Sequence, residues 1–251
     1  MSDPFESSKF SIAWAKDHIA ELQREIDAFL GGDDACTFIT EPNINGTYQV
    51  LKVKFRKPMP RSLRGHAGDA AINLRNALGQ AICSVFALAD IPKNNTYFPI
   101  ARDLTELEST LTKGWCKGLP QGISDIVRRS KPYKGGNNLL WALNKLSGIN
   151  KHSILRPVML SNDLIEVSGF AVGIWLYSPP RWKSDKEELV VARIPAGRDF
   201  DINYQAAFFI AFNEIEFLDG EEVTAVLNKF VDVVEGIVMA IEADAPRIGL
   251  L

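Results

Sequence analysis

Residues 62–90 read SLRGHAGDAAINLRNALGQAICSVFALAD, and this stretch carries the clearest structural pattern in the chain. At about 100° per residue its apolar side chains gather on one side of a helix, namely Ala67, Ala71, Leu74, Leu78, Ala81, Ile82 and Val85. A polar stripe of His66, Asp69, Asn73, Asn76 and Gln80 lies on roughly the opposite side. The pattern predicts a long amphipathic helix that buries one face and turns the other to water or to a polar cleft.

Helical periodicity also appears on both sides of this stretch. Residues 8–30 predict an amphipathic helix that ends at the glycine pair 31–32, and residues 220–243 predict a closing helix with Asp219 as its N-cap. Shorter helical segments are expected at residues 103–113, 120–130 and 137–148, separated by Gly and Pro.

Strand patterns occupy two other parts of the chain. Residues 36–40 and 47–57 predict a strand pair joined through the Asn45-Gly46 turn. Segments rich in β-branched and aromatic residues predict further strands, at 164–177, 188–194 and 206–217. The order of elements indicates an α+β fold with an antiparallel sheet. We expect a single domain over residues 1–251, with helices mainly in 1–156 and strands mainly in 157–251.

The composition excludes several classes of protein. The apolar fraction is 46% and the charged fraction 24%, which are ordinary globular values and argue against a disordered chain or a small disulfide scaffold. The longest apolar runs fall well short of the roughly 20 residues that a membrane-spanning helix needs, and the first residues do not form a signal peptide. Three widely spaced cysteines suit reduced thiols, so we expect a cytoplasmic protein without membrane contact.

The charge is unevenly distributed along the chain. The formal net charge is −3, but residues 49–156 hold 18 basic and 6 acidic side chains, whereas both ends of the chain are acidic. Residues proposed to bind a polyanion come from the basic part: Arg128, Arg129, Lys131, Tyr133, Lys134 and Lys151. Clustered cations beside aromatic rings are typical of nucleic-acid binding, so nucleic acid is the first expected partner.

A second interpretation of the charge stays open. The basic middle of the chain can pack against its own acidic ends, so that each neutralises the other. A related expectation is a non-enzymatic interaction module in which basic and acidic surfaces of two copies meet in a homo-oligomer. Salt-sensitive binding of nucleic acid favours the polyanion interpretation, and salt-sensitive self-association without nucleic acid favours the module.

Residues 68–80 carry a family resemblance. The run GDAAINLRNALGQ resembles the pattern G-[D/E]-x-x-x-N-L-R-x-A-L-D-H of a group of uncharacterised bacterial and phage-associated proteins. Segments matching that group's later F-P-I and K-H motifs occur at 98–100 and 151–152. The resemblance covers roughly the first 155 residues, and the group implies no function that transfers to this chain.

The same run also resembles the R-x4-6-H signature of HEPN ribonucleases, which implies metal-independent RNA cleavage by an Arg and a His. Arg75 occupies the arginine position, but Gln80 stands where the histidine would be, so a titratable group is missing there. A third hypothesis is therefore a nuclease-like enzyme that uses Arg75 with His152 or His66. Whether the protein is an enzyme stays open.

Arg75 has a structural interpretation as well. It lies on the apolar side of its helix, where a half-buried guanidinium usually has a carboxylate or carbonyl partner. We expect that partner to come from another element, and a structural ion pair is the favoured interpretation. Asp69 and Asn73 are assigned structural polar roles on the same helix. The scattered His and Cys residues match no metal-binding spacing, and no phosphate loop or dinucleotide motif is present, so we expect neither a metal nor a cofactor.

Overall fold

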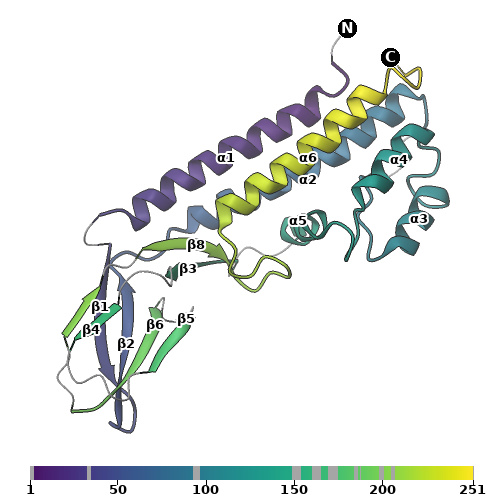
Figure 1. Cartoon of the computed structure of the whole chain (residues 1–251). Coiled ribbons are helices and arrows are strands. Elements are labelled where there is room, and N and C mark those ends of the chain that lie inside the picture. The colour runs from purple at the N-terminus through teal and green to yellow at the C-terminus, as the bar shows by residue number, and fades with distance from the viewer. Residues whose placement is uncertain are drawn as a thin grey trace.

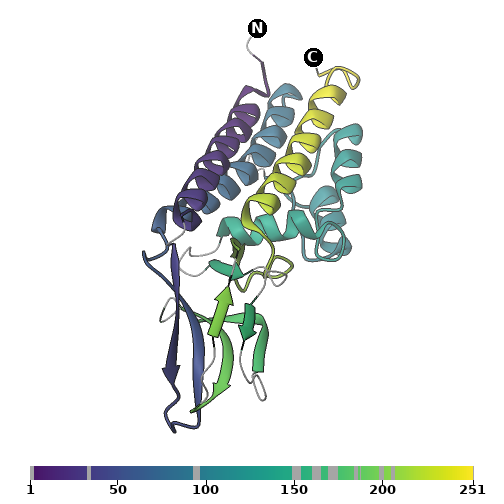
Figure 2. The same ribbon diagram turned by 60° about the vertical axis from the view of Figure 1, so that its left-hand side comes forward.

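The computed structural model describes residues 3–32, 35–92, 97–148, 154–159, 165–168, 175–183, 186, 188–197, 201–204 and 207–250. Three long helices, α1 (Glu6–Leu30), α2 (Arg61–Leu88) and α6 (Val223–Asp244), run side by side, and an antiparallel sheet lies at one end of them (Figure 1). This arrangement confirms the α+β fold class. The chain ends emerge at the opposite end from the sheet (Figure 2).

Within the described residues, three shorter helices complete the helical part: α3 (Leu104–Thr112), α4 (Gln121–Ser130) and α5 (Asn138–Gly148). Helix α4 packs on α6, and α5 packs on α2 and α6. Asp103 caps the start of α3 by accepting a hydrogen bond from the Glu106 N–H, and Asn137 accepts from the N–H groups of Leu139 and Leu140 at the start of α5. These caps fix where α3 and α5 begin.

The main sheet has the strand order β1-β2-β6-β5, all antiparallel. Its strands are β1 (Cys36–Pro42), β2 (Tyr48–Phe55), β6 (Glu188–Pro195) and β5 (Trp175–Lys183). Two further pairs join β3 (Leu155–Met159) to β8 (Phe208–Phe212) and β4 (Ile165–Ser168) to β7 (Asp201–Tyr204). Strands from both halves of the sequence therefore share one sheet.

The apolar side of α2 lies in the centre of the helical core. Every member of its predicted apolar row, from Ala67 to Val85, is fully buried, together with facing residues of α1 and α6. A smaller cluster, which includes Leu51 and Val191, forms the core of the sheet. Phe55 packs against both clusters, with its ring 5.3 Å from that of Phe29 on α1 and 5.3 Å from that of Phe208. Aromatic packing thus joins the helices to the sheet.

One predicted helix start is wrong. Glu222, rather than Asp219, caps α6, because its carboxylate accepts hydrogen bonds from the N–H groups of Thr224 and Ala225. Asp219 instead accepts from the Glu214 N–H and pairs with Arg156. Among the described helices, none combines the length and the apolar character that crossing a bilayer requires.

Candidate functional site

An open cavity of about 500 Å³ lies between α2 and α5. Helix α2 lines it with residues spaced three and four apart, which share one face: Arg75, Asn76, Gly79, Gln80 and Cys83. Helix α5 contributes Asn144, Ser147 and Gly148 from its last turns, and Tyr97 closes another side. Amide, hydroxyl and charged side chains are among these, so the cavity offers hydrogen-bonding groups to a ligand.

Arg75 is the charged group of this cavity. Its Nε donates a hydrogen bond to Oδ1 of Asn144 at 3.0 Å, and its Nη2 donates to the carbonyl of Phe98 at 2.9 Å. Both acceptors are neutral, and within the described residues no Asp or Glu pairs with Arg75. Of the two kinds of partner expected, the described residues supply a carbonyl and no carboxylate, and α5 presents an amide beside it.

Burial also acts on the guanidinium of Arg75. The pKa of Arg75 is lowered by burial, but an arginine side chain stays protonated near neutral pH. The two hydrogen bonds to Asn144 and Phe98 use two of the five N–H donors of the group. Among the described residues, the cavity thus holds a positive charge that neutral groups orient and that no carboxylate neutralises.

The polar stripe of α2 is divided between two surroundings. Asn76 and Gln80 border the cavity, and Gln80 also accepts a hydrogen bond from the Ser11 hydroxyl of α1 at 2.9 Å. Asn73 donates its amide to the backbone carbonyl of Asp69, one turn earlier, at 2.9 Å. His66 faces α1 instead. Part of the stripe therefore lines a polar cavity, and part of it serves helix packing.

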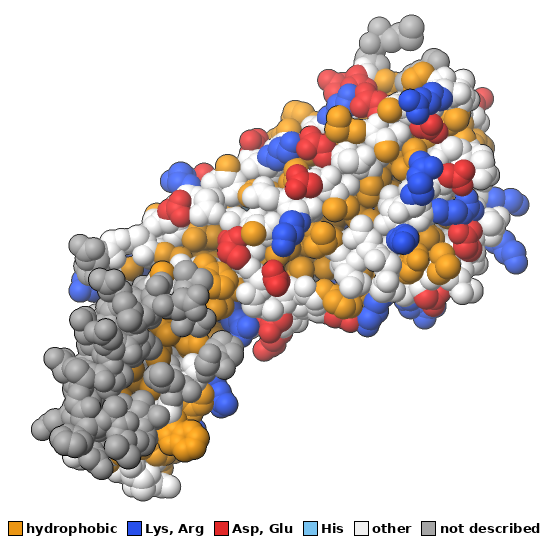
Figure 3. Space-filling model, in the orientation of Figure 1, with side chains coloured by type: hydrophobic (Ala, Val, Ile, Leu, Met, Phe, Trp, Pro, Cys, Tyr) orange, Lys and Arg blue, Asp and Glu red, His pale blue; other side chains and the backbone are white. Residues whose placement is uncertain are grey.

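Two of the predicted polyanion-binding residues are paired with carboxylates. Arg128 donates from Nε to Glu108 at 2.9 Å and lies 3.2 Å from Asp125, and these contacts raise the pKa of Arg128. Lys134 pairs with Glu216 at 2.6 Å. On the face shown in Figure 3, cationic and anionic side chains are likewise interspersed over the helices. Binding of phosphate by Arg128 or Lys134 would require these pairs to open.

The other predicted binding residues are placed differently. Arg129 and Lys131 at the end of α4 are exposed, and within the described residues neither pairs with a carboxylate. Tyr133 is half-buried and packs against the helical core, so its ring is only partly available for stacking. Lys151 and His152 lie outside the described residues.

The structure separates Arg75 from His66. Nine residues of α-helix place them on opposite sides of α2 and about 13 Å apart along its axis. These two side chains therefore do not meet at one substrate, which removes this pair from the nuclease-like hypothesis. Asn144 and Ser147, which do share the cavity with Arg75, have no distinctive sequence pattern beyond an i, i+3 spacing near a helix end.

Comparisons with protein-family models, with curated proteins and with solved structures find no match to this chain. The resemblance to the bacterial and phage-associated group therefore stays a prediction from the motif in residues 68–80.

Proposed function

We propose that this protein binds a ligand bearing a phosphate or carboxylate group in the cavity around Arg75. The observation that carries the proposal is the half-buried Arg75 guanidinium, held by the neutral acceptors Asn144 and Phe98. A buried charge is costly unless it is paired, so an anionic ligand would offset the cost of burying Arg75.

The rest of the cavity suits the remainder of such a ligand. A guanidinium can hold the two oxygens of a phosphate or carboxylate with parallel hydrogen bonds. The amides of Asn76 and Gln80 and the hydroxyl of Ser147 add donors and acceptors within the same cavity. A volume of about 500 Å³ lies within the usual range for small-molecule sites, so a free nucleotide or the phosphorylated end of a nucleic-acid strand is of suitable size.

A broader polyanion surface is the second candidate. Arg129 and Lys131 are exposed and within the described residues have no carboxylate partner, so they can contact a phosphate backbone without breaking an ion pair. This candidate predicts binding that depends on the end of α4 and that falls steeply with salt. The cavity candidate predicts binding that depends on Arg75 and needs only one anionic group.

Titration calorimetry distinguishes the two. The probes are inorganic phosphate, adenosine monophosphate and a short RNA with or without a 5′ phosphate. We expect Arg75→Gln to weaken binding of the phosphorylated probes by about 10- to 150-fold, the range for a lost charged hydrogen bond. Asn144→Asp keeps the arginine in place and supplies a competing carboxylate, so we expect a similar loss.

The control is the double variant Arg129→Gln with Lys131→Gln, which removes two exposed charges outside the cavity. It should bind the small probes as the wild type does. If this control abolishes RNA binding while Arg75→Gln leaves it intact, the surface candidate replaces the cavity candidate. Absence of binding of every probe by the wild type contradicts both candidates.

A further inference from the structure

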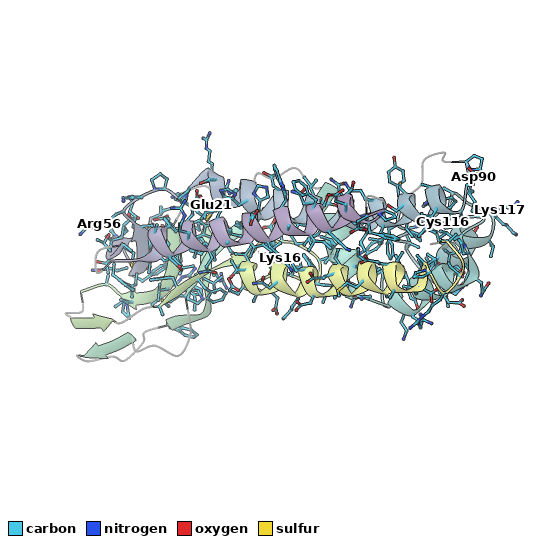
Figure 4. The ribbon with its side chains drawn as sticks, turned by 90° about the horizontal axis from the view of Figure 1, so that it is seen from above. Lys16, Glu21, Arg56, Asp90, Cys116 and Lys117 are labelled. Atoms are coloured by element: carbon cyan, nitrogen blue, oxygen red, sulfur yellow. The ribbon has the colours of Figure 1, made fainter. Side chains whose placement is uncertain are left out.

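A second group of polar side chains lies where α1 packs against α2, nearer the start of α2 than the Arg75 cavity. Glu21, Glu25 and His66 each offer a ligand atom there, and these atoms all lie within 4.8 Å of one another. Figure 4 shows Glu21 on the side of α1 that faces away from α6, whereas Lys16 lies between α1 and α6 and pairs with Glu235. Helix α1 therefore has one charged side that contacts α6 and another beside α2.

We propose that this group is a binding site for a divalent first-row transition-metal ion, with Glu21, Glu25 and His66 as its protein ligands. The site does not depend on the Arg75 cavity. Linear spacing could not indicate it, because the two carboxylates come from one helix and the imidazole from another.

The two helices present these groups by their periodicity. His18, Glu21 and Glu25 are three, four and seven residues apart, so they lie on one side of α1. Helix α2 runs antiparallel to α1 and supplies Ser62 and His66, which are one turn apart. Between the proposed ligands, Nε2 of His66 lies 3.7 Å from Oε1 of Glu25.

Two further side chains, His18 and Ser62, contact these ligands through hydrogen-bonding atoms. Nδ1 of His66 lies 3.3 Å from Nδ1 of His18, so a neutral His66 that donates from Nδ1 has its Nε2 lone pair directed to the side of Glu25. The Ser62 hydroxyl donates to Oε2 of Glu25 at 2.5 Å, which leaves Oε1 for an ion. His18 and Ser62 thus act as supporting groups rather than ligands.

The ligand set indicates the class of metal. Two carboxylates and one imidazole suit Zn²⁺, Co²⁺, Mn²⁺ or Fe²⁺, whereas Mg²⁺ and Ca²⁺ prefer oxygen ligands alone. With bonds of about 2.0–2.2 Å to one tetrahedral ion, ligand atoms lie about 3.4 Å apart, so these atoms must approach one another by up to about 1.4 Å. All three side chains are only half-buried, which permits this movement. Three protein ligands leave a coordination position for water or substrate.

One neighbouring side chain competes with the ion. Arg24 pairs with Glu21 on the same helix, and this contact lowers the pKa of Glu21. Part of the charge of Glu21 is therefore already engaged, and a metal ion must compete with Arg24 for it. Removing Arg24 should strengthen metal binding by up to about fivefold, the range of a surface ion pair.

The test is titration of the chelator-treated full chain with Zn²⁺ by calorimetry and with Co²⁺ by absorption spectroscopy. We expect one ion per chain, and we expect Glu25→Gln and His66→Gln each to weaken binding by about 10- to 100-fold. Asp17→Asn is the matched control, because it removes one carboxylate from an exposed position of the same helix. It should leave the affinity unchanged, and Arg24→Gln should increase it.

Three results would overturn the proposal. One is no binding of either ion by the wild type, and a second is equal affinity in the wild type, Glu25→Gln and His66→Gln. A third is a thiolate-to-cobalt charge-transfer band, which would place the ion on a cysteine. Circular dichroism of each variant checks that its helices persist. Arg24→Gln is expected to bind the metal more tightly than the wild type, so this variant still tests the proposal if a ligand variant unfolds.

Discussion

Lys52 of β2 and Glu188 of β6 form an ion pair inside the sheet, with Nζ 2.9 Å from Oε2 and 3.0 Å from Oε1 of the carboxylate. Both side chains are nearly inaccessible to water, and Glu41 of β1 accepts a third hydrogen bond from Lys52 at 2.6 Å. A cation of the basic middle segment is thus neutralised by acids of both ends of the chain. The pair of Arg156 with Asp219 follows the same pattern.

Replacing Lys52 should destabilise the protein strongly. In Lys52→Met, Glu188 keeps its buried charge and loses its partner, which costs about 3–5 kcal/mol in comparable pairs. The double variant Lys52→Met with Glu188→Leu should recover most of this loss, since no buried charge then remains. Urea unfolding measures both free energies, and a single variant as stable as the wild type contradicts the prediction.

The same pair predicts a loss of stability at alkaline pH. Burial acts to lower the pKa of Lys52, but Glu41 and Glu188 outweigh burial, and the net pKa is raised. The pKa of Lys52 is thus higher in the folded protein than in the unfolded chain. The ion pair therefore stabilises the protein fully below about pH 10.4, and this stabilisation disappears as the pH rises through the folded pKa. The free energy of unfolding of the wild type should therefore fall more steeply above pH 10 than that of the double variant.

Two glycines should respond in opposite ways to alanine. A Cβ at Gly65, within α2, meets no atom within 4 Å, so Gly65→Ala should stabilise the helix by about 0.5–1 kcal/mol. A Cβ at Gly136 would lie 2.6 Å from the carbonyl oxygen of Lys131 and 2.7 Å from the Tyr133 ring, so Gly136→Ala should cost about 1–3 kcal/mol. Thermal unfolding of the two variants measures the difference, and equal shifts of the melting temperature contradict the prediction.

The cysteines should differ in their reactivity with alkylating reagents. Cys116 is fully buried, and burial raises its pKa to about 12, so little of the reactive thiolate forms at pH 8. Cys83 lines the Arg75 cavity and should react before Cys116. Its reaction rate should fall when phosphate occupies the cavity. Peptide mapping by mass spectrometry identifies the modified residue, with Cys83→Ser as the control. Equal labelling of Cys116 in the folded protein contradicts the prediction.

Local patterns accounted for much of the secondary structure. The predicted helix over 62–90 is observed as Arg61–Leu88, and its apolar row is buried as expected, because periodicity depends only on residues a few positions apart. The cap of α6 was mispredicted, since Asp219 and Glu222 both have capping side chains and only the path of the loop decides which reaches the free N–H groups. The functional sites depended far more on contacts between distant segments.

The sequence alone determined the α+β class, the long amphipathic helices and Arg75 as a residue to examine. Only the tertiary structure decided that Arg75 meets an amide on α5, that Lys52 meets Glu188, and that His66 meets the carboxylates of α1. The physical reason is that helix and strand patterns arise from neighbours along the chain, whereas the partner of a charged side chain depends on which distant segment the packing places beside it.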